Sequence, residues 1–263
     1  MSKLQERLEI VTRKWWFFAI VVVIQFLPPV TSYRYDPSRT SEVIGNILGH
    51  AYAYGPGWRA LYPVFDSLAI LMLIGVFWVR NRWGRIFAAY AGVSYVIFAF
   101  IQNMADIPGQ GHGIVTNNVV MFLCVALVWL LEAGAGRTDF QGMIFKPSRS
   151  WVIFPALMAF WYPLDWRTFM PDFRLSHLLF GPSGVTFCLM TPMFLAVLIL
   201  CYPRSNVVTL RVTGIFGVII AIYNLMFMVM QMDRLWWYGV LHLPLLLISL
   251  YGLVLGYRRQ TAG

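Results

Sequence analysis

Long apolar stretches alternate with short polar segments along almost the whole chain. The hydrocarbon layer of a bilayer is about 30 Å thick, so a helix needs roughly 20 apolar residues to cross it. Most of the stretches have this length, whereas the first and the fifth are shorter and end at Pro28-Pro29 and Pro163. The stretches are residues 15–32, 59–79, 86–104, 114–134, 150–164, 184–202, 208–230 and 235–257. The sequence predicts an all-α integral membrane protein with about eight transmembrane helices.

The composition fits a lipid environment. Hydrophobic residues make up 59% of the chain and charged residues 12%, whereas a soluble domain is about a quarter charged. The net charge of +9 does not indicate a nucleic-acid partner, because the basic residues stand at the ends of apolar stretches instead of forming one patch. The three cysteines lie inside apolar stretches without a CxxC pair. No motif identifies a cofactor.

The basic residues predict the orientation. The alternate connecting segments that include both termini carry fourteen Lys and Arg residues, and the other connecting segments carry six. Because Lys- and Arg-rich segments stay in the cytoplasm, both termini are expected on the cytoplasmic side of the inner membrane. Glu6 and Glu9 precede the first stretch and no small-residue cleavage site follows it. That stretch is therefore expected to be an uncleaved span.

The first outer loop is long and holds apolar residues at helical spacing from Val43 to Tyr52. Thr40-Ser41 come just before them and are residue types that cap helices. A short helix lying at the outer membrane interface is expected here.

The two halves of the chain share a pattern. A histidine and then a Gly-Pro pair occur in each half, as His50 with Gly55-Pro56 and as His177 with Gly181-Pro182. Four spans in each half would make the halves two parallel repeats. Chance recurrence of Trp, Gly and Pro, which membrane helices favour, is the alternative. The halves are residues 1–135 and 136–263.

Polar residues inside the spans fall almost entirely in the outer half of the membrane, and only Glu132 lies near the inner end. Such side chains usually face a bundle interior or a water-filled cavity. We therefore expect an outward-facing polar vestibule, closed toward the cytoplasm by apolar packing. Its expected lining is Asp66, Asn103, Asn117, Asn118, Asn224 and His242, with Gln25, Gln102 and Gln231 at similar depth.

Asp66 is the most informative of these residues. An isolated carboxylate in hydrocarbon must take up a proton, pair with a cation or contact water. Ion, proton or substrate binding is one interpretation, and a hydrogen-bonded carboxyl that packs helices together is the other. The same choice applies to Asn117-Asn118 and Gln102-Asn103, which can join helices by hydrogen bonds.

The outer segments also hold His50, His112 and His177. These side chains are candidate metal ligands. No HxxxH or HxH pair exists, so a metal site would have to assemble from distant loops. Interfacial or helix-capping histidines are the alternative interpretation.

One part of the chain carries a family pattern. Tyr162-Pro163 ends an apolar stretch, and after a long loop Phe180 to Phe187 open the next. This order resembles an uncharacterised family of bacterial polytopic membrane proteins, in which Tyr-Pro closes one helix and Pro-Cys-Pro-Thr-Thr opens the next. The cysteine and the second proline of that turn are missing here. The resemblance implies a polytopic membrane fold and no particular activity.

Three functions remain open from sequence alone. The first is binding or transport of a small solute or ion through the vestibule. The second is a structural or assembly subunit, with partner membrane subunits or a homo-oligomer embedded in the lipid bilayer. The third is a metal-dependent enzyme whose site lies at the outer face.

Overall fold

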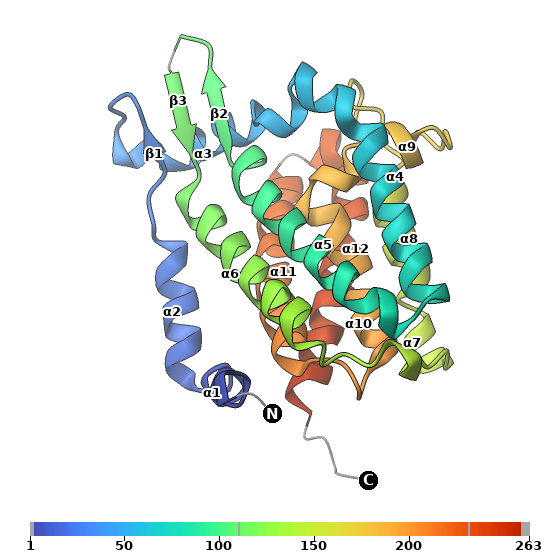
Figure 1. The fold of residues 1–263 in the computed structure, drawn as a ribbon. Coiled ribbons are helices and arrows are strands. Elements are labelled where there is room, and N and C mark those ends of the chain that lie inside the picture. Colours follow the sequence, from blue (N-terminus) through green and yellow to red (C-terminus); the bar gives the residue numbers. More distant parts are fainter. Residues whose placement is uncertain (1–2, 110, 231, 259–263) are drawn as a thin grey trace.

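The computed structural model describes residues 3–109, 111–230 and 232–258, and apart from one small sheet its regular structure is helical (Figure 1). Five of these helices are long and apolar enough to cross a membrane, which supports the predicted membrane protein. They are α4 (Pro56–Trp78), α5 (Asn81–Ile101), α6 (Thr116–Ala135), α11 (Val207–Met230) and α12 (Met232–Tyr257).

Three other apolar helices are shorter than a span. α2 (Trp15–Gln25) has 11 residues, α8 (Ile153–Trp161) has 9 and α10 (Phe187–Cys201) has 15. At 1.5 Å per residue, α2 and α8 are only about 17 and 14 Å long. α10 reaches span length only together with His177–Val185, from which it is bent by 91°. The structure thus supports five spans, or six with the bent pair, and the eight spans and the repeats remain predictions.

Short helices and turns connect the longer ones. They are α1 (Lys3–Val11), η1 (Pro37–Arg39), α3 (Thr40–Gly49), η2 (Tyr52–Tyr54), η3 (Phe140–Gly142), α7 (Pro147–Ser150), α9 (His177–Phe180) and η4 (Ser183–Val185). α3 confirms the helix predicted in the first outer loop. The predicted cap is wrong, because Thr40 already lies inside the helix, and Asp36 instead caps η1 by accepting the Ser38 N–H at 2.9 Å.

A three-stranded antiparallel sheet was not expected from the sequence. β1 (Val30–Thr31) pairs with β3 (Gly111–Ile114), which pairs with β2 (Met104–Ile107). β2 and β3 form a hairpin that joins the end of α5 to the start of α6. The hairpin places Asp106 directly opposite His112.

The two ends of the bundle carry different structures (Figure 1). We call the end with β1, β2, β3 and α3 the sheet end. The opposite end, which we call the α1 end, holds α1, and the Tyr257 hydroxyl joins the last turn of α12 to it by donating to the Thr12 carbonyl at 2.6 Å. The segments predicted as Lys- and Arg-rich lie at the α1 end, except that Arg259 is outside the described residues.

The centre of the bundle is apolar and aromatic. Every residue of α10 is buried, as expected for a helix that is apolar on all sides. The Phe194 ring lies 5.6–5.8 Å, between centroids, from the rings of Phe87, Tyr95 and Trp129. This packing brings α5, α6 and α10 together between the two ends.

Candidate functional site

Asp66 is fully buried in α4, ten residues after the Pro56 that opens this helix. Its Oδ1 accepts the backbone N–H of Gly184 at 2.7 Å, and the Gly181 N–H adds a further attraction to the carboxylate. Oδ2 is buried and has no hydrogen-bond partner among the described residues. No described Lys, Arg or His side chain forms an ion pair with Asp66. The carboxylate is therefore only half satisfied.

The backbone that faces Asp66 belongs to the bend between η4 and α10. Gly184 lies so close to α4 that a Cβ there would be 2.7 Å from the carbonyl carbon of Phe65 and 2.9 Å from the amide nitrogen of Asp66. A side chain is excluded at such distances, so glycine allows the close approach. The hydrogen bond to Asp66 and the close packing of Gly184 against α4 together hold the bend beside Asp66.

Other side chains also form hydrogen bonds at this bend. The N–H of Phe187, the first residue of α10, donates to Gln102 Oε1 at 2.9 Å. The Ser183 hydroxyl donates to the Phe160 carbonyl at 2.5 Å. The Thr186 hydroxyl is buried without a partner among the described residues, and so is the hydroxyl of Tyr90, which interacts electrostatically with Asp66. Buried polar groups therefore gather around the bend, and several remain unpaired.

Asn103 and Asn118 form a second polar group, between α5 and α6. The Asn118 amide donates to Asn103 Oδ1 at 2.8 Å, and the Asn103 amide donates to the carbonyls of Phe98 and Ala99 at 3.1 and 3.2 Å. Asn117 is buried beside them. This is the geometry of a hydrogen bond that joins two helices.

Asn224 and His242 belong to a third group, between α11 and α12. The Tyr238 hydroxyl donates to Asn224 Oδ1 at 2.8 Å, and the Asn224 amide donates to the Ile220 carbonyl at 2.8 Å. His242 Nδ1 lies 2.7 Å from the Tyr238 carbonyl, with the two rings 4.2 Å apart between centroids. The Asn224 amide also reaches Cys188 Sγ at 3.6 Å, in the first turn of α10.

All six predicted lining residues lie between the middle of the bundle and the sheet end. They form three separate groups, and no hydrogen bond among the described residues joins one group to another. The third group touches α10 just after the bend. Gln231, expected at the same depth, lies outside the described residues.

The three histidines predicted as metal ligands do not meet. Nδ1 of His50 lies 2.9 Å from the Asn46 carbonyl of its own helix. His112 Nδ1 lies 3.0 Å from Asp106 Oδ1, and His177 Nε2 lies 2.9 Å from Asp172 Oδ2. No three His, Cys, Asp or Glu side chains are grouped for metal binding in the described part of the chain. His50 follows the last residue of α3, His112 lies in β3 and His177 begins α9.

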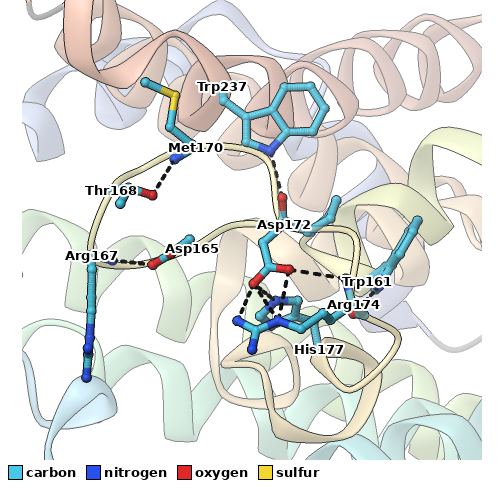
Figure 2. A network of polar contacts seen from close by, with 10 residues as sticks. Trp161, Asp165, Arg167, Thr168, Met170, Asp172, Arg174, His177 and Trp237 are labelled. Carbon is cyan, nitrogen blue, oxygen red and sulfur yellow. Dashed lines mark hydrogen bonds and ion pairs between the residues drawn. The ribbon is translucent and has the colours of Figure 1, made fainter.

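Two of the histidines instead stabilise exposed loops. Tyr52 donates to Asp106 Oδ2 at 2.7 Å, and this bond, followed by the one to His112, lowers the pKa of Asp106. In the loop before α9, Asp172 contacts Arg174 and His177 (Figure 2). The guanidinium of Arg174, and then the imidazole, hold the pKa of Asp172 well below its usual value.

Trp161 and Trp237 fix the same loop to the bundle (Figure 2). The indole N–H of Trp161 donates to the Arg174 carbonyl at 3.0 Å, and that of Trp237 donates to the Pro163 carbonyl at 2.7 Å. The polar contacts of this loop therefore hold the loop in place, and they need no bound ligand to explain them.

At the α1 end, two buried charged residues have structural partners. Glu132 Oε1 accepts the Thr138 N–H at 2.6 Å, and Oε2 accepts the Asn206 amide at 2.7 Å. Arg211 is fully buried and donates to the Gly256 carbonyl at 2.5 Å and the Thr12 hydroxyl at 3.2 Å. Arg211 is one of the basic residues counted for orientation, and its place inside the apolar stretch 208–230 is a sequence signal of a buried role.

Comparisons with protein-family models, with curated proteins and with solved structures found no match for this chain. The resemblance noted in the sequence therefore remains a prediction, and function has to be inferred from the residues of this chain.

Proposed function

We propose that this chain is a polytopic membrane protein that binds, or binds and transports, a small solute or ion in the half of the bundle toward the sheet end. Asp66 is the residue that contacts it. The observation that carries this proposal is a fully buried carboxylate with one unpartnered oxygen and no counter-ion among the described residues.

Burial makes this arrangement costly. A buried polar atom without a hydrogen bond costs about 1–3 kcal/mol, and more when the group is charged. A carboxylate in a membrane interior is usually compensated by a cation, a proton or a polar ligand. Asp66 lacks such compensation from the chain itself, so a bound cation, proton or solute donor fits the free Oδ2.

The bend between η4 and α10 supports the same proposal. Membrane transporters commonly bind solutes where a helix is interrupted, because the interruption frees backbone groups for the ligand. Here the bend directs the Gly184 N–H at Asp66 and leaves the Thr186 hydroxyl unpaired nearby in the chain. Asn224 and His242, which reach the start of α10 through Cys188, extend the proposed vestibule.

The proposed orientation follows from charge. The α1 end carries the Lys- and Arg-rich segments, and such segments are retained in the cytoplasm. We place the α1 end and both termini in the cytoplasm and the sheet end outside, in the inner membrane. In this orientation the proposed site lies in the outer half of the membrane.

Thermal unfolding of the purified protein in mild detergent tests the proposal. The solute panel contains Na⁺, K⁺, Ca²⁺, ammonium and small zwitterions. We expect at least one solute to raise the melting temperature of the wild type and of the control Asp106→Asn, which removes an exposed carboxylate. The same solute should not stabilise Asp66→Asn, and should stabilise Tyr90→Phe less. Equal stabilisation of all four proteins by every active solute would refute the proposal.

A structural or assembly subunit is the second candidate, and α2 favours it. This helix is too short to span a bilayer, and the side chains at its ends, Trp15 and Phe26, are 79% and 81% exposed. Partner subunits, or a second copy of this chain, would cover such a helix. Stoichiometric partner bands, or a homo-oligomer, after purification in mild detergent would support this role. The metal-dependent enzyme gains no support, because its three histidines lie in separate networks.

A further inference from the structure

A cavity of about 270 Å³ lies at the α1 end of the bundle, far along α5 and α6 from the sheet. It is lined by the start of α5, the end of α6 and the loop that follows α6. Arg85 stands in the second turn of α5, and Arg137 directly follows Gly136, the C-terminal cap of α6. The ends of two spanning helices lie at the depth of the lipid headgroups.

The acidic residues that line this cavity are already engaged by other groups. Both oxygens of Glu132 accept hydrogen bonds, from Thr138 and Asn206. Asp139 accepts from Asn81 at 2.8 Å and from Arg204 at 3.1 Å. The bond from Asn81 lowers the pKa of Asp139, and the Arg204 guanidinium offsets the negative charge of this carboxylate.

The basic residues of the cavity have no such partners. Neither the Arg85 nor the Arg137 side chain makes a hydrogen bond, ion pair or ring contact with any residue in the described ranges. Gly136 has a left-handed backbone, with φ at 58°, and a Cβ there would lie 2.7 Å from Arg85 Nε. The glycine thus leaves the space that the guanidinium uses. Two unpaired guanidinium groups therefore border one cavity.

We propose that this cavity binds the phosphate of an anionic membrane lipid through Arg85 and Arg137. Guanidinium groups bind phosphate oxygens in pairs of parallel hydrogen bonds. Basic pockets between spanning helices are known to hold lipid headgroups. The cavity is slightly smaller than pockets that enclose a drug-sized ligand, about 300 Å³ or more, and suits a phosphate with part of its glycerol. This site is independent of the proposed solute site around Asp66.

A fluorescence titration of the purified full chain in detergent tests the assignment. The probes are labelled phosphatidylglycerol, labelled phosphatidylcholine and, as an unlabelled competitor, inorganic phosphate. The variants are Arg85→Gln/Arg137→Gln and the matched control Arg82→Gln, which removes an arginine from the first turn of the same helix but outside the cavity lining. Arg85→Lys/Arg137→Lys keeps the charge.

We expect the wild type to bind phosphatidylglycerol more tightly than phosphatidylcholine. Each basic group at a membrane surface contributes about fivefold in affinity, so the double Gln variant should bind phosphatidylglycerol roughly 25-fold more weakly. The Arg82→Gln variant should bind like the wild type, and the double Lys variant should lie between them.

The other outcomes are also decisive. Binding of inorganic phosphate that depends on Arg85 and Arg137, together with lipid binding that does not, would keep the phosphate site and assign free phosphate as its source. Equal affinity of the wild type, the double Gln variant and Arg82→Gln for both lipids would overturn the site. If the double Gln variant does not fold, the single Arg137→Gln variant gives the same test, with about fivefold weaker binding expected.

Discussion

Asp66 and Glu132, the two buried carboxylates among the described residues, lie in opposite halves of the bundle and differ in how they are satisfied. Both are at most 1% exposed. Both oxygens of Glu132 accept short hydrogen bonds, whereas Asp66 accepts one and leaves Oδ2 without a partner among the described residues. The chain can therefore build full compensation for a buried carboxylate. The missing hydrogen bond at Asp66 is the observation on which the proposed binding site rests.

The largest expected effect is the loss of Glu132. Glu132→Ala leaves the Thr138 N–H and the Asn206 amide buried without acceptors, at about 1–3 kcal/mol each. We expect the free energy of unfolding to fall by about 2–6 kcal/mol, measured by reversible denaturation in detergent micelles. A loss well below about 1 kcal/mol would show that water replaces the carboxylate of Glu132. The hydrogen bonds of Glu132 would then not distinguish it from Asp66.

Gly184→Ala should give the next largest effect, because the new methyl group would press on the backbone of α4 beside Asp66. Overpacking of this kind costs about 1–3 kcal/mol. The matched control is Gly57→Ala in the first turn of α4, where a Cβ meets no atom within 4 Å. The melting temperature should fall for Gly184→Ala and not for Gly57→Ala. Equal melting temperatures would mean that the bend is not packed as closely as described.

Substitution of Asn103 or Asn118 should lower the stability less, because this pair joins two helices by a hydrogen bond between uncharged groups. Hydrogen bonds between membrane helices contribute about 0.6 kcal/mol on average and at most about 1.7 kcal/mol. A double-mutant cycle with Asn103→Ala and Asn118→Ala should return a coupling energy in this range. Solute binding should be unchanged in both single variants, because these residues are assigned a packing role. Loss of solute binding in Asn103→Ala would move this pair into the binding site.

The smallest expected effect concerns Asp172, a carboxylate with several partners at the surface. Its pKa is lowered in the folded chain, first by Arg174 and then by His177. Between the folded and the unfolded pKa, the unfolded chain binds a proton that the folded chain does not, so stability falls as the pH falls. The contribution of Asp172 should be complete above about pH 4, the usual pKa range of Asp, and decline below it. The acid side of the stability curve should be shallower in Asp172→Asn, and parallel curves would contradict the ion pair.

Local pattern accounts for much of the fold. Each predicted apolar stretch contains a helix of the structure, because hydropathy depends on neighbouring residues, whereas α1 and α9 lie outside the stretches. The helix from Thr40 was also predictable from its spacing. The lengths of the helices were less predictable, since α2 ends at Gln25 within the stretch 15–32 and α8 covers only Ile153–Trp161 of the stretch 150–164. The hairpin around Asp106 and His112 was missed because it occupies the space between two apolar stretches.

The site itself depends on contacts between distant residues. Asp66 and Gly184 are 118 positions apart, and Glu132 and Asn206 are 74 apart. Sequence spacing gives no information about such pairs. The asparagines are a further example. The sequence indicated that their amides can join helices, but not that Asn103 would accept a hydrogen bond from Asn118. The place of Asp66 inside an apolar helix was predictable, whereas its hydrogen bond from the Gly184 N–H was not.

The most direct test of the central claim is the unfolding free energy of Asp66→Asn, measured with and without the solute that stabilises the wild type. The variant keeps an acceptor for the Gly184 N–H and removes the uncompensated charge. We expect its stability without solute to lie within about 1 kcal/mol of the wild type or above it, with no gain when solute is added. A loss as large as that of Glu132→Ala, together with an undiminished response to solute, would show that Asp66 is a structural carboxylate.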